Sequence, residues 1–433
     1  MTTHGVRLFS RFCLGLNLLG VCLGARLAVA QVAPPVSLDA LAEKYKPAPA
    51  PPPAGLLLQK GDRLAICGDS ITEQKMYSRI METYLTVCVP ELKVTVRQYG
   101  WGGETAGGFL ARMTNDCLRF KPTIATTCYG MNDHRYRAYE DSIGEAYRQN
   151  QTAIVRAFKA HGARVVLGSP GCVSKRPEAL NLSLCRLRNI CIEIAQQEQV
   201  GFADVFWPMF TAGEVAKQRW GSDYMIAGKD TIHPGWAGHL IMAYAFLKAL
   251  GLDGDIGTFT VDLERGSATV SPGHELVSYR DGELRVRSYR YPFCATGEVS
   301  SDNSLRSGMA LVPFNRELNR LLLVVKNPSA ARYRVSWGDQ SKSFAADALR
   351  RGVNLAEEFE VNPFSEAFTA VDRAVAAKQE YETRQIKVLF HGPEFRADPE
   401  AVVSLTERVR APLVEAIGKA FVPVTHTIRL SPE

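Results

Sequence analysis

The strongest constraint on the fold is a regular alternation over residues 56–252, where short apolar runs are followed by longer amphipathic stretches. Strand-length apolar runs that alternate with helical patterns are typical of successive βα units and a parallel sheet. We therefore predict an α/β domain with a flavodoxin-like, doubly wound, three-layer architecture. Its strands are expected at residues 63–67, 93–99, 123–129, 164–168 and 201–206, and its helices near residues 75–88, 105–120, 142–161, 177–199 and 236–250.

The first thirty residues follow a different pattern. Arg7 and Arg11 precede an apolar run that ends at Ala25, and the segment closes on the small-x-small triplet Ala28-Val29-Ala30. This order is typical of a cleaved export signal, and the run of about 14 residues is shorter than the ~20 that a membrane span needs. We predict a signal peptide at residues 1–30 and a periplasmic or secreted protein without a membrane span after signal removal.

The regions that flank the α/β domain have their own composition. Residues 31–55 are rich in Pro and Ala and are expected to form an extended linker. Residues 253–345 are expected to form a β-rich accessory domain, with the hairpin turn Asp281-Gly282 between two of its strands. Residues 346–433, with amphipathic stretches at 363–385 and 399–421, are expected to be mainly helical. The strand-like runs of the accessory domain lie at residues 258–263, 268–271, 276–279, 284–288, 321–326 and 332–337.

Charge and cysteine content exclude some classes of function. The net charge of +6 is small for 433 residues, half of it comes from arginines in the expected signal, and no basic cluster is present. This balance argues against nucleic acid as a partner. Eight of the ten cysteines follow the signal; export permits disulfides, and buried free thiols are the alternative. No Cys/His spacing is typical of a zinc site.

Polar motifs follow the expected strands at the end where a ligand crevice forms in an open α/β sheet. The first strand leads into Gly68-Asp69-Ser70, the second into residues 100–105 and the third into Gly130-Met131-Asn132-Asp133, whereas Asp230 and His233 precede the last helix. Each motif also has a plainer explanation. Ser70 suits a helix N-cap, with Glu73 completing a capping box. Asn132 also suits a cap, and His233 can pack beneath a helix.

Taken together, the motifs provide the parts of a serine nucleophile site. His233 can accept the proton of Ser70, and Asp230, three residues away, can orient the imidazole and stabilise its charged form. The N–H groups of Ser70 and Gly103 and the amide of Asn132 come from three strand ends and can face a developing oxyanion. Glycine at position 103 lets the backbone approach the reacting carbonyl closely.

These motifs resemble those of the SGNH hydrolases, also called GDSL esterases and lipases, over residues 61–251. Residues 68–72, 102–105, 130–133 and 230–234 are similar to the family's first, second, third and fifth blocks, although Gly102 stands where many members carry Ser. The resemblance implies hydrolysis of carboxylic esters through an acyl-enzyme, without metal or organic cofactor. It assigns a catalytic triad of Ser70, Asp230 and His233, and an oxyanion hole formed by Ser70, Gly103 and Asn132.

The substrate is less constrained than the chemistry. Trp101, Tyr129 and Trp236 adjoin the motifs and are candidate substrate-binding residues, with packing between helices as the alternative. Export, an accessory β domain and the lack of a long apolar lid favour an acetyl ester of a carbohydrate. The alternatives are a lipase or lysophospholipase, an acyltransferase of the same family, and a non-catalytic carbohydrate-binding or cell-surface protein on the same scaffold. The oligomeric state is not readable from the sequence.

Overall fold

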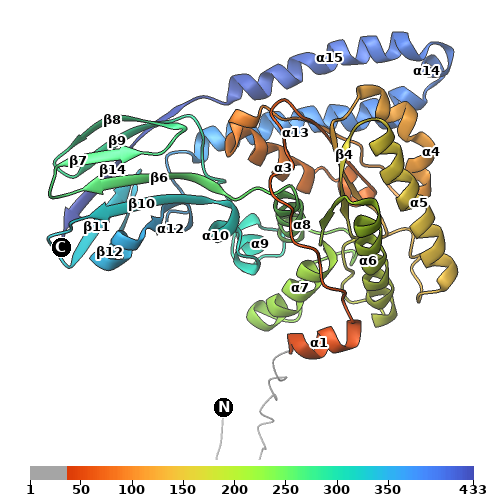
Figure 1. Ribbon diagram of the computed structural model, residues 1–433, viewed down its shortest axis with the longest axis horizontal. Coiled ribbons are helices and arrows are strands. Elements are labelled where there is room, and N and C mark those ends of the chain that lie inside the picture. The colour runs from red at the N-terminus through yellow and green to blue at the C-terminus, as the bar shows by residue number, and fades with distance from the viewer. Residues whose placement is uncertain (1–36) are drawn as a thin grey trace, which may run out of the picture. The chain divides into compact units, whose positions relative to one another are not determined.

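The central element of the structure, a computed structural model, is a five-stranded parallel sheet. The structure describes residues 37–433, so the expected signal peptide at residues 1–30 lies outside the described part. The strands follow the order β2-β1-β3-β4-β5, which is the flavodoxin-like order and confirms the predicted fold class (Figure 1). The strands are β1 (Arg63–Gly68), β2 (Thr95–Gln98), β3 (Ile124–Cys128), β4 (Arg164–Gly168) and β5 (Gly201–Ala203).

Helices cover both faces of this sheet. The alternating side chains of β1 explain why, since Leu64 and Ile66 enter one apolar core and Ala65 and Cys67 the other. The first core contains α3 (Tyr77–Val87) and α8 (Trp236–Ala249), and the second contains most of α4 (Ala106–Asp116), α5 (Asp141–Ala160) and α6 (Glu178–Glu198). The motifs at the carboxyl ends of the strands therefore share one edge of the sheet.

One helix of the α/β domain was not predicted. The fifth strand ends at Ala203 instead of residue 206, and α7 (Phe206–Trp220) follows it. Its first turn contains Phe206, Trp207 and Pro208, and the aromatic residues, which favour strands, concealed the start of the helix.

The segment expected to be an extended linker is partly folded. Leu38–Tyr45 forms helix α1, whose N-cap Ser37 accepts the Ala40 N–H at 3.3 Å. The ring of Tyr45 is buried 4.6 Å from that of Phe210. The N–H of Ala48 donates to Asn189 of α6 at 3.0 Å. The Pro/Ala composition favoured a spacer, but an N-cap and a buried aromatic residue are enough to anchor one short helix.

Two further sheets follow the α/β domain. The four-stranded sheet has the order β13-β10-β6-β7, and the five-stranded sheet has the order β12-β11-β14-β9-β8. The strands are β6 (Asp255–Asp262), β7 (Ser267–Val270), β8 (His274–Arg280), β9 (Glu283–Ser288), β10 (Arg320–Lys326), β11 (Arg332–Trp337), β12 (Gln340–Ala345), β13 (Val353–Asn354) and β14 (Val424–Pro432).

The last strand, β14, belongs to a region that was predicted to be mainly helical. It lies between β9 and β11 and is antiparallel to both. His426, Ile428 and Leu430 alternate along it as buried residues. The β-rich part of the protein is therefore completed by the C-terminal end of the described chain, where 69 residues separate β14 from the preceding strand.

A chain of hydrogen bonds runs through the core of these strands. The Trp337 Nε1–H donates to His426 Nδ1 at 3.1 Å, so His426 Nε2–H donates to Ser288 Oγ at 3.0 Å and the Ser288 hydroxyl donates to His274 Nδ1 at 2.8 Å. Burial lowers the pKa of His426 to about 3, which keeps the ring neutral. Ser288 has no exposed surface, so this Ser–His pair is structural and out of reach of a substrate.

Two long C-terminal helices bring distant sequence against the α/β domain. Helix α13 (Ser365–Lys387) packs on α3 and on the edge strand β2, and α15 (Pro399–Ala420) lies alongside α13 (Figure 1). Lys378 of α13, 1% exposed, pairs with Glu82 at 2.7 Å and Glu382 at 3.1 Å and donates to the Val96 carbonyl at 2.6 Å. Helix α13 thus covers a sheet edge that would otherwise expose unpaired backbone groups. The remaining helices are α9 (Leu305–Leu311), α10 (Phe314–Leu318), α11 (Ala346–Arg351), α12 (Leu355–Glu358) and α14 (Pro393–Ala397), with short 3₁₀ turns at Pro90–Leu92, Leu118–Phe120 and Leu389–His391.

All eight cysteines of the described residues are buried free thiols: Cys67, Cys88, Cys117, Cys128, Cys172, Cys185, Cys191 and Cys294.

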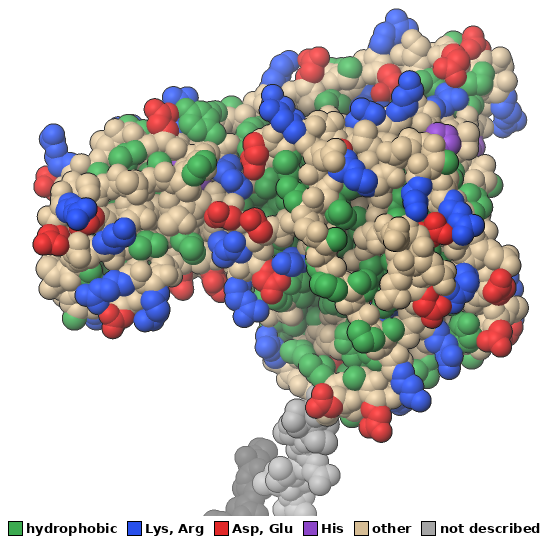
Figure 2. Space-filling model, viewed as in Figure 1, with side chains coloured by type: hydrophobic (Ala, Val, Ile, Leu, Met, Phe, Trp, Pro, Cys, Tyr) green, Lys and Arg blue, Asp and Glu red, His purple; other side chains and the backbone are tan. Residues whose placement is uncertain are grey.

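Figure 2 shows acidic and basic side chains interspersed over the visible face. Between residues 37 and 433, no helix has the length and apolar character of a membrane span. The same residues contain no group of three or more His, Cys, Asp or Glu side chains placed to hold a metal ion.

Candidate active site

Ser70 lies at the first position of a short helix, and its hydroxyl is not used as a helix cap. Helix α2 (Ser70–Glu73) begins directly after β1, and its N-cap is Asp69, whose carboxylate accepts the Ile71 N–H at 3.0 Å. Glu73 pairs with Lys387 of α13 at 2.6 Å instead of completing a capping box. The alternative interpretation of Ser70 as an N-cap is therefore wrong, and its hydroxyl is available for chemistry.

Three of the predicted residues form one hydrogen-bonded chain. His233 Nε2 lies 2.7 Å from Ser70 Oγ, and His233 Nδ1 lies 2.6 Å from Asp230 Oδ2. Because a carboxylate only accepts, Nδ1 carries the proton and Nε2 presents a lone pair to the serine hydroxyl. The His233 and Asp230 side chains are 32% and 56% exposed, so the chain opens to solvent. This arrangement can activate a serine hydroxyl as a nucleophile.

The carboxylate of Asp230 is held by its own loop. Its Oδ1 accepts the N–H groups of Ile232 at 3.0 Å and His233 at 2.8 Å. Partial burial raises the pKa of Asp230, whereas these two N–H groups and the His233 ring lower it. The lowering is the larger effect, so the pKa of Asp230 lies below its ordinary value. Asp230 therefore stays ionised and keeps a negative charge beside the imidazole.

The loop between Asp230 and His233 has a strained backbone. Thr231 has a φ of 79°, which is unfavourable for a β-branched residue. Its N–H donates to the Gly228 carbonyl at 2.9 Å, its carbonyl accepts the Ser174 N–H at 3.0 Å, and its hydroxyl accepts from Arg176 Nε at 2.5 Å. Strain of this kind persists where the surroundings over-determine it and is common at functional sites. The sequence gives no signal for it.

The two other predicted oxyanion donors lie on neighbouring loops. Gly103 has a φ of +73°, a conformation that favours glycine, and the space that a Cβ would take there is open, with no atom within 4 Å. Asn132 donates one N–H to the Glu104 carbonyl at 3.0 Å and accepts from the Tyr136 hydroxyl at 3.1 Å. Both contacts fix the orientation of the amide, which has a second N–H to offer.

Tyr136 is a residue of this site that the sequence analysis missed. Its side chain is 44% exposed although it is large and aromatic. Arg135 and Tyr136 have consecutive φ values of 54° and 53°, a conformation that L-residues other than Gly, Asn and Asp rarely adopt. This turn places the Tyr136 hydroxyl on Asn132. The only sequence signal was an aromatic residue four positions after Asn132.

The candidate substrate-binding residues have different surroundings. Tyr129 has no exposed surface, stacks on Phe109 at 5.5 Å and donates to Glu104 at 3.0 Å. The expectation that Tyr129 contacts substrate is therefore wrong, because apolar strand neighbours and a buried acceptor hold it in the core. Trp101 and Trp236 are half-buried and keep part of each ring accessible.

Helix α13 explains why Gly102 departs from the family pattern. A Cβ at position 102 would lie 2.8 Å from the carboxylate of Glu73, and Lys387 holds that carboxylate in place at 2.6 Å. Lys387 Nζ also lies 5.5 Å from the centroid of the Trp101 ring, within range of a cation–π contact. Helix α13 thus contacts both α2, which begins with Ser70, and the loop that contains Gly103.

Two buried acids, Asp69 and Asp133, accept hydrogen bonds from the backbone of the active-site loops. Burial raises the pKa of Asp69 to about 7 and that of Asp133 to about 6. Asp69 caps α2, and Asp133 accepts the Ala106 N–H at the start of α4 at 3.0 Å. Both carboxyls can keep these hydrogen bonds in the neutral form.

Replacing Asp69 with asparagine should change how stability depends on pH. Native Asp69 holds its proton up to a pH of about 7, whereas the unfolded chain releases it near pH 4, so this group lowers stability as pH rises through that window. Asparagine keeps an acceptor for the Ile71 N–H and does not titrate. We compare the unfolding free energy of Asp69→Asn with that of the wild type at pH 5 and at pH 8.5. We expect the difference to shift by about 3 kcal/mol in favour of the variant at the higher pH. Denaturant unfolding at both pH values measures this, and parallel curves would contradict it.

Comparisons with known proteins identify what this chain is similar to. Residues 66–241 match the GDSL-like Lipase/Acylhydrolase family. An acetylxylan esterase from Geobacillus stearothermophilus is 23% identical over 216 residues, which are 45% of this chain and 95% of that protein. The solved structure of BT4096, a gut microbial diltiazem-metabolizing enzyme, is 22% identical with a TM-score of 0.70, and the alignment covers 88% of this chain and 100% of that chain. A crystal structure of the Geobacillus acetylxylan esterase Axe2 is 21% identical with a TM-score of 0.40, covering 46% of this chain and 97% of that one.

The likeness to BT4096 extends the shared fold beyond the α/β domain, since it covers 88% of the chain. The family match begins within β1 and includes the candidate residues up to the first turns of α8. Residues 66–241 therefore form a GDSL-like lipase/acylhydrolase domain of the SGNH hydrolase type, and the protein is a carboxylic ester hydrolase.

Proposed function

We propose that this protein removes acetyl groups from carbohydrate esters through an acyl-enzyme on Ser70. The observation that carries the proposal is the hydrogen-bonded chain from Ser70 through His233 to Asp230, with contacts of 2.7 and 2.6 Å, in a domain of an ester hydrolase family. We assign Ser70 as the nucleophile, His233 as the general base and acid, and Asp230 as the residue that orients and stabilises the imidazolium.

The first half-reaction acylates the serine. Ser70 Oγ attacks the ester carbonyl carbon while His233 Nε2 accepts the hydroxyl proton. The backbone N–H groups of Ser70 and Gly103 and the second N–H of Asn132 stabilise the oxyanion. When the tetrahedral intermediate collapses, His233 gives its proton to the departing alcohol oxygen, and the acyl group remains on Ser70.

The second half-reaction releases the acid. Water takes the place of the alcohol, His233 accepts a proton from it, and the resulting hydroxide attacks the acyl carbonyl within the same oxyanion donors. Collapse of this intermediate breaks the bond to Ser70 Oγ, which regains its proton from His233. Asp230 stays ionised throughout, consistent with its lowered pKa.

Carbohydrate as the alcohol component is supported by the relative and by the rim of the site. The curated relative is an acetylxylan esterase. Half-exposed Trp101 and Trp236 and the exposed Tyr136 combine apolar faces with polar edges, which suits a ring that carries hydroxyl groups. The export pattern of residues 1–30 supports an activity outside the cytoplasm.

Release of acetate distinguishes the proposal from its alternatives. We expect the wild type to release acetate from acetylated xylo-oligosaccharides, and to hydrolyse p-nitrophenyl palmitate far more slowly than p-nitrophenyl acetate. Preferential cleavage of the long-chain ester would favour a lipase. Acetylated acceptor sugar among the products would favour acyl transfer, and saccharide binding without any ester cleavage would favour a binding protein.

Tyr136→Phe should lower kcat modestly. Loss of the hydroxyl removes one of the two contacts that orient the Asn132 amide, and a hydrogen bond of this kind contributes about 0.5–1.5 kcal/mol. We therefore expect kcat for p-nitrophenyl acetate to fall about 2- to 13-fold, with a smaller change in KM. Tyr139→Phe, in the same loop but without a contact to Asn132, is the matched control. Equal rates for the wild type and both variants would contradict the role given to Tyr136.

A further inference from the structure

We propose that a cavity beside His233, formed in part by the C-terminal region, holds the saccharide portion of the ester. This inference rests on the proposed function and adds a binding site to it. The cavity has a volume of about 300 Å³, which accommodates one pyranose unit. Its polar and aromatic lining includes Arg79, Trp236, Asn303, Ser304 and Asp372, and its apolar lining includes Ile80, Phe293, Leu305 and Phe368.

The two α/β-domain helices that line the cavity begin a few residues after the candidate catalytic groups, α3 seven residues after Ser70 and α8 three residues after His233. Trp236 is the first residue of α8 and follows His233 by three positions. The His239 ring of α8 connects α8 to the segment between α2 and α3. Its Nε2 lies 2.9 Å from the side-chain oxygen of Gln74, which directly follows α2, and its Nδ1 accepts the Tyr77 N–H at the start of α3 at 3.3 Å. Arg79 lies two residues further along α3. The first turns of α3 and α8 thus connect the cavity to Ser70 and His233.

The segment that follows the α/β domain closes the cavity against the loop of His233. The Asp302 carbonyl accepts the Ala237 N–H at 3.2 Å, and the Asn303 side chain accepts the Trp236 N–H at 3.4 Å. A Cβ at Gly235 would lie 2.7 Å from the Asp302 carbonyl. Asn303 and Ser304, which line the cavity, therefore lie next to the loop that precedes α8.

The chemistry of the lining fits a neutral, hydroxyl-rich ring. The Arg79 guanidinium lies 5.5 Å from the centroid of the Trp236 ring and forms a two-pronged ion pair with Asp372 of α13, in which Arg79 Nε donates at 2.8 Å. The aromatic face can pack against the C–H face of a sugar, while guanidinium and carboxylate offer donors and acceptors to its hydroxyls. Because their charges balance, the pair favours an uncharged saccharide over an anionic ligand.

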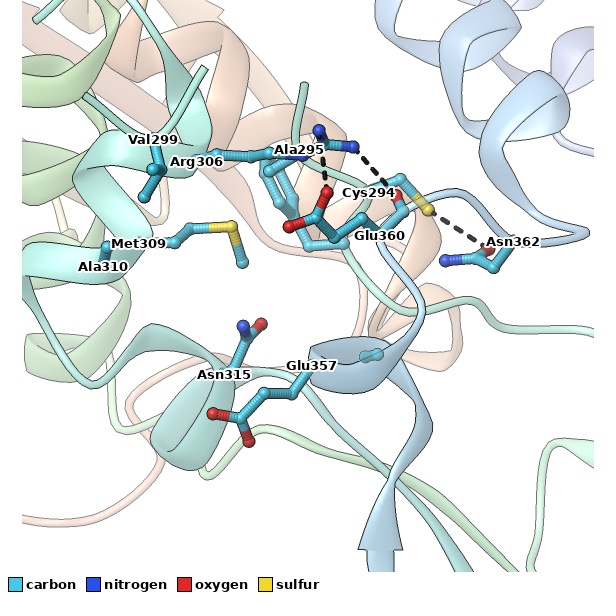
Figure 3. A pocket seen from close by; sticks show the side chains of 12 residues that line it. Cys294, Ala295, Val299, Arg306, Met309, Ala310, Asn315, Glu357, Glu360 and Asn362 are labelled. Atoms are coloured by element: carbon cyan, nitrogen blue, oxygen red, sulfur yellow. Dashed lines mark hydrogen bonds and ion pairs between the residues drawn. The ribbon is translucent and has the colours of Figure 1, made fainter. Parts of the chain in front are cut away.

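A second cavity, lined mostly by other residues of the region after the α/β domain, has a different character. Figure 3 shows its side chains, where Arg306 pairs with Glu360 at 3.0 Å and Glu357 adds another carboxylate. It shares Phe293 with the saccharide cavity, but all its lining residues lie between 293 and 362. None of them belongs to the α/β domain, so we assign it no part in the reaction.

This assignment gives the C-terminal regions a role in choosing the substrate. Phe293, Asn303, Ser304 and Leu305 follow the family-matched domain, and Phe368 and Asp372 come from α13. The nucleophile and the oxyanion donors come from the α/β domain, whereas eight of the eleven residues that line the saccharide site come from outside it. Residues beyond 252 therefore determine which alcohol is accepted.

The test compares two acetyl esters, an acetylated xylotriose and p-nitrophenyl acetate, which lacks a saccharide. For Trp236→Ala we expect kcat/KM on acetylated xylotriose to fall about tenfold or more, mainly through KM, with a loss of less than about threefold on p-nitrophenyl acetate. Trp236→Phe should recover part of the loss, and Asp372→Asn should show the same selective effect. Trp220→Ala, a half-buried tryptophan of α7 that packs on Tyr224, is the control for loss of an aromatic side chain, and thermal melting confirms that each variant folds.

The outcomes separate this inference from the proposed function. Equal losses on both substrates, or none on acetylated xylotriose, would overturn the saccharide site while leaving the esterase activity in place. If the wild type releases no acetate from acetylated xylotriose, the proposed substrate is wrong, and xylotriose binding to Ser70→Ala is then measured by calorimetry. Binding that Trp236→Ala abolishes would support the site, and absence of binding would overturn it.

Discussion

Ser70→Ala is expected to lower kcat for p-nitrophenyl acetate by about 10⁴- to 10⁶-fold, close to the limit of detection. The variant lacks the only atom that can carry the acyl group in this account, while Gly103, Asn132 and the binding surface still give some acceleration over water. The Ser70 hydroxyl is 2.7 Å from His233 and caps no helix, so its loss should change the melting temperature little. Initial rates measured with a detection range of five decades, together with a thermal melt, check both statements.

Ser142→Ala provides the matched control for this substitution. Ser142 is an exposed serine on α5, and its replacement should leave the rate unchanged. A Ser70→Ala enzyme as active as Ser142→Ala would show that the ester is cleaved elsewhere.

Asp230→Asn is expected to lower kcat by about 10³-fold. Asparagine keeps an oxygen for the N–H groups of Ile232 and His233, so the loop should retain its shape. It carries no charge, however, and cannot stabilise the imidazolium that forms when His233 takes the serine proton. A buried aspartate in this role is worth about 10⁴ in kcat, and the effect should be smaller here because Asp230 is 56% exposed and water screens its charge.

The control for Asp230→Asn is Asp223→Asn. Asp223 is an exposed acid that pairs with Lys175 at 2.9 Å, and its loss should leave kcat within a factor of about two. Rates measured at several pH values separate a change in protonation from a loss of fold. Similar kcat values for Asp230→Asn and the wild type would remove Asp230 from the mechanism.

The α/β sheet could be predicted because its determinants are local. Short apolar runs such as residues 164–168 match their strand, and the motifs follow strand ends that any parallel sheet brings to one edge. The same reasoning brought Ser70, Asp230 and His233 together. It failed for Tyr129, because a residue next to a motif can equally point into the core, where this ring stacks on Phe109.

The features that the sequence did not reveal depend on long-range packing or on rare backbone angles. Glu73 and Lys387 are 314 residues apart and meet only because α13 crosses α3 and β2. The positive φ values of Thr231 and Tyr136 fall on residues with no intrinsic preference for them. Strand β14 was overlooked because its partners β9 and β11 lie about 90–140 residues earlier, and long-range pairing leaves no local signal.

The most direct test of the central claim is covalent labelling of the nucleophile. The wild-type protein is treated with a p-nitrophenyl phosphonate ester, digested, and analysed by peptide mass spectrometry while residual esterase activity is followed. The account predicts one phosphonyl group per chain, on Ser70, with labelling and loss of activity proceeding in parallel and no label in Ser70→Ala. A label on another residue that accompanies the loss of activity, or full activity in protein labelled on Ser70, would contradict it.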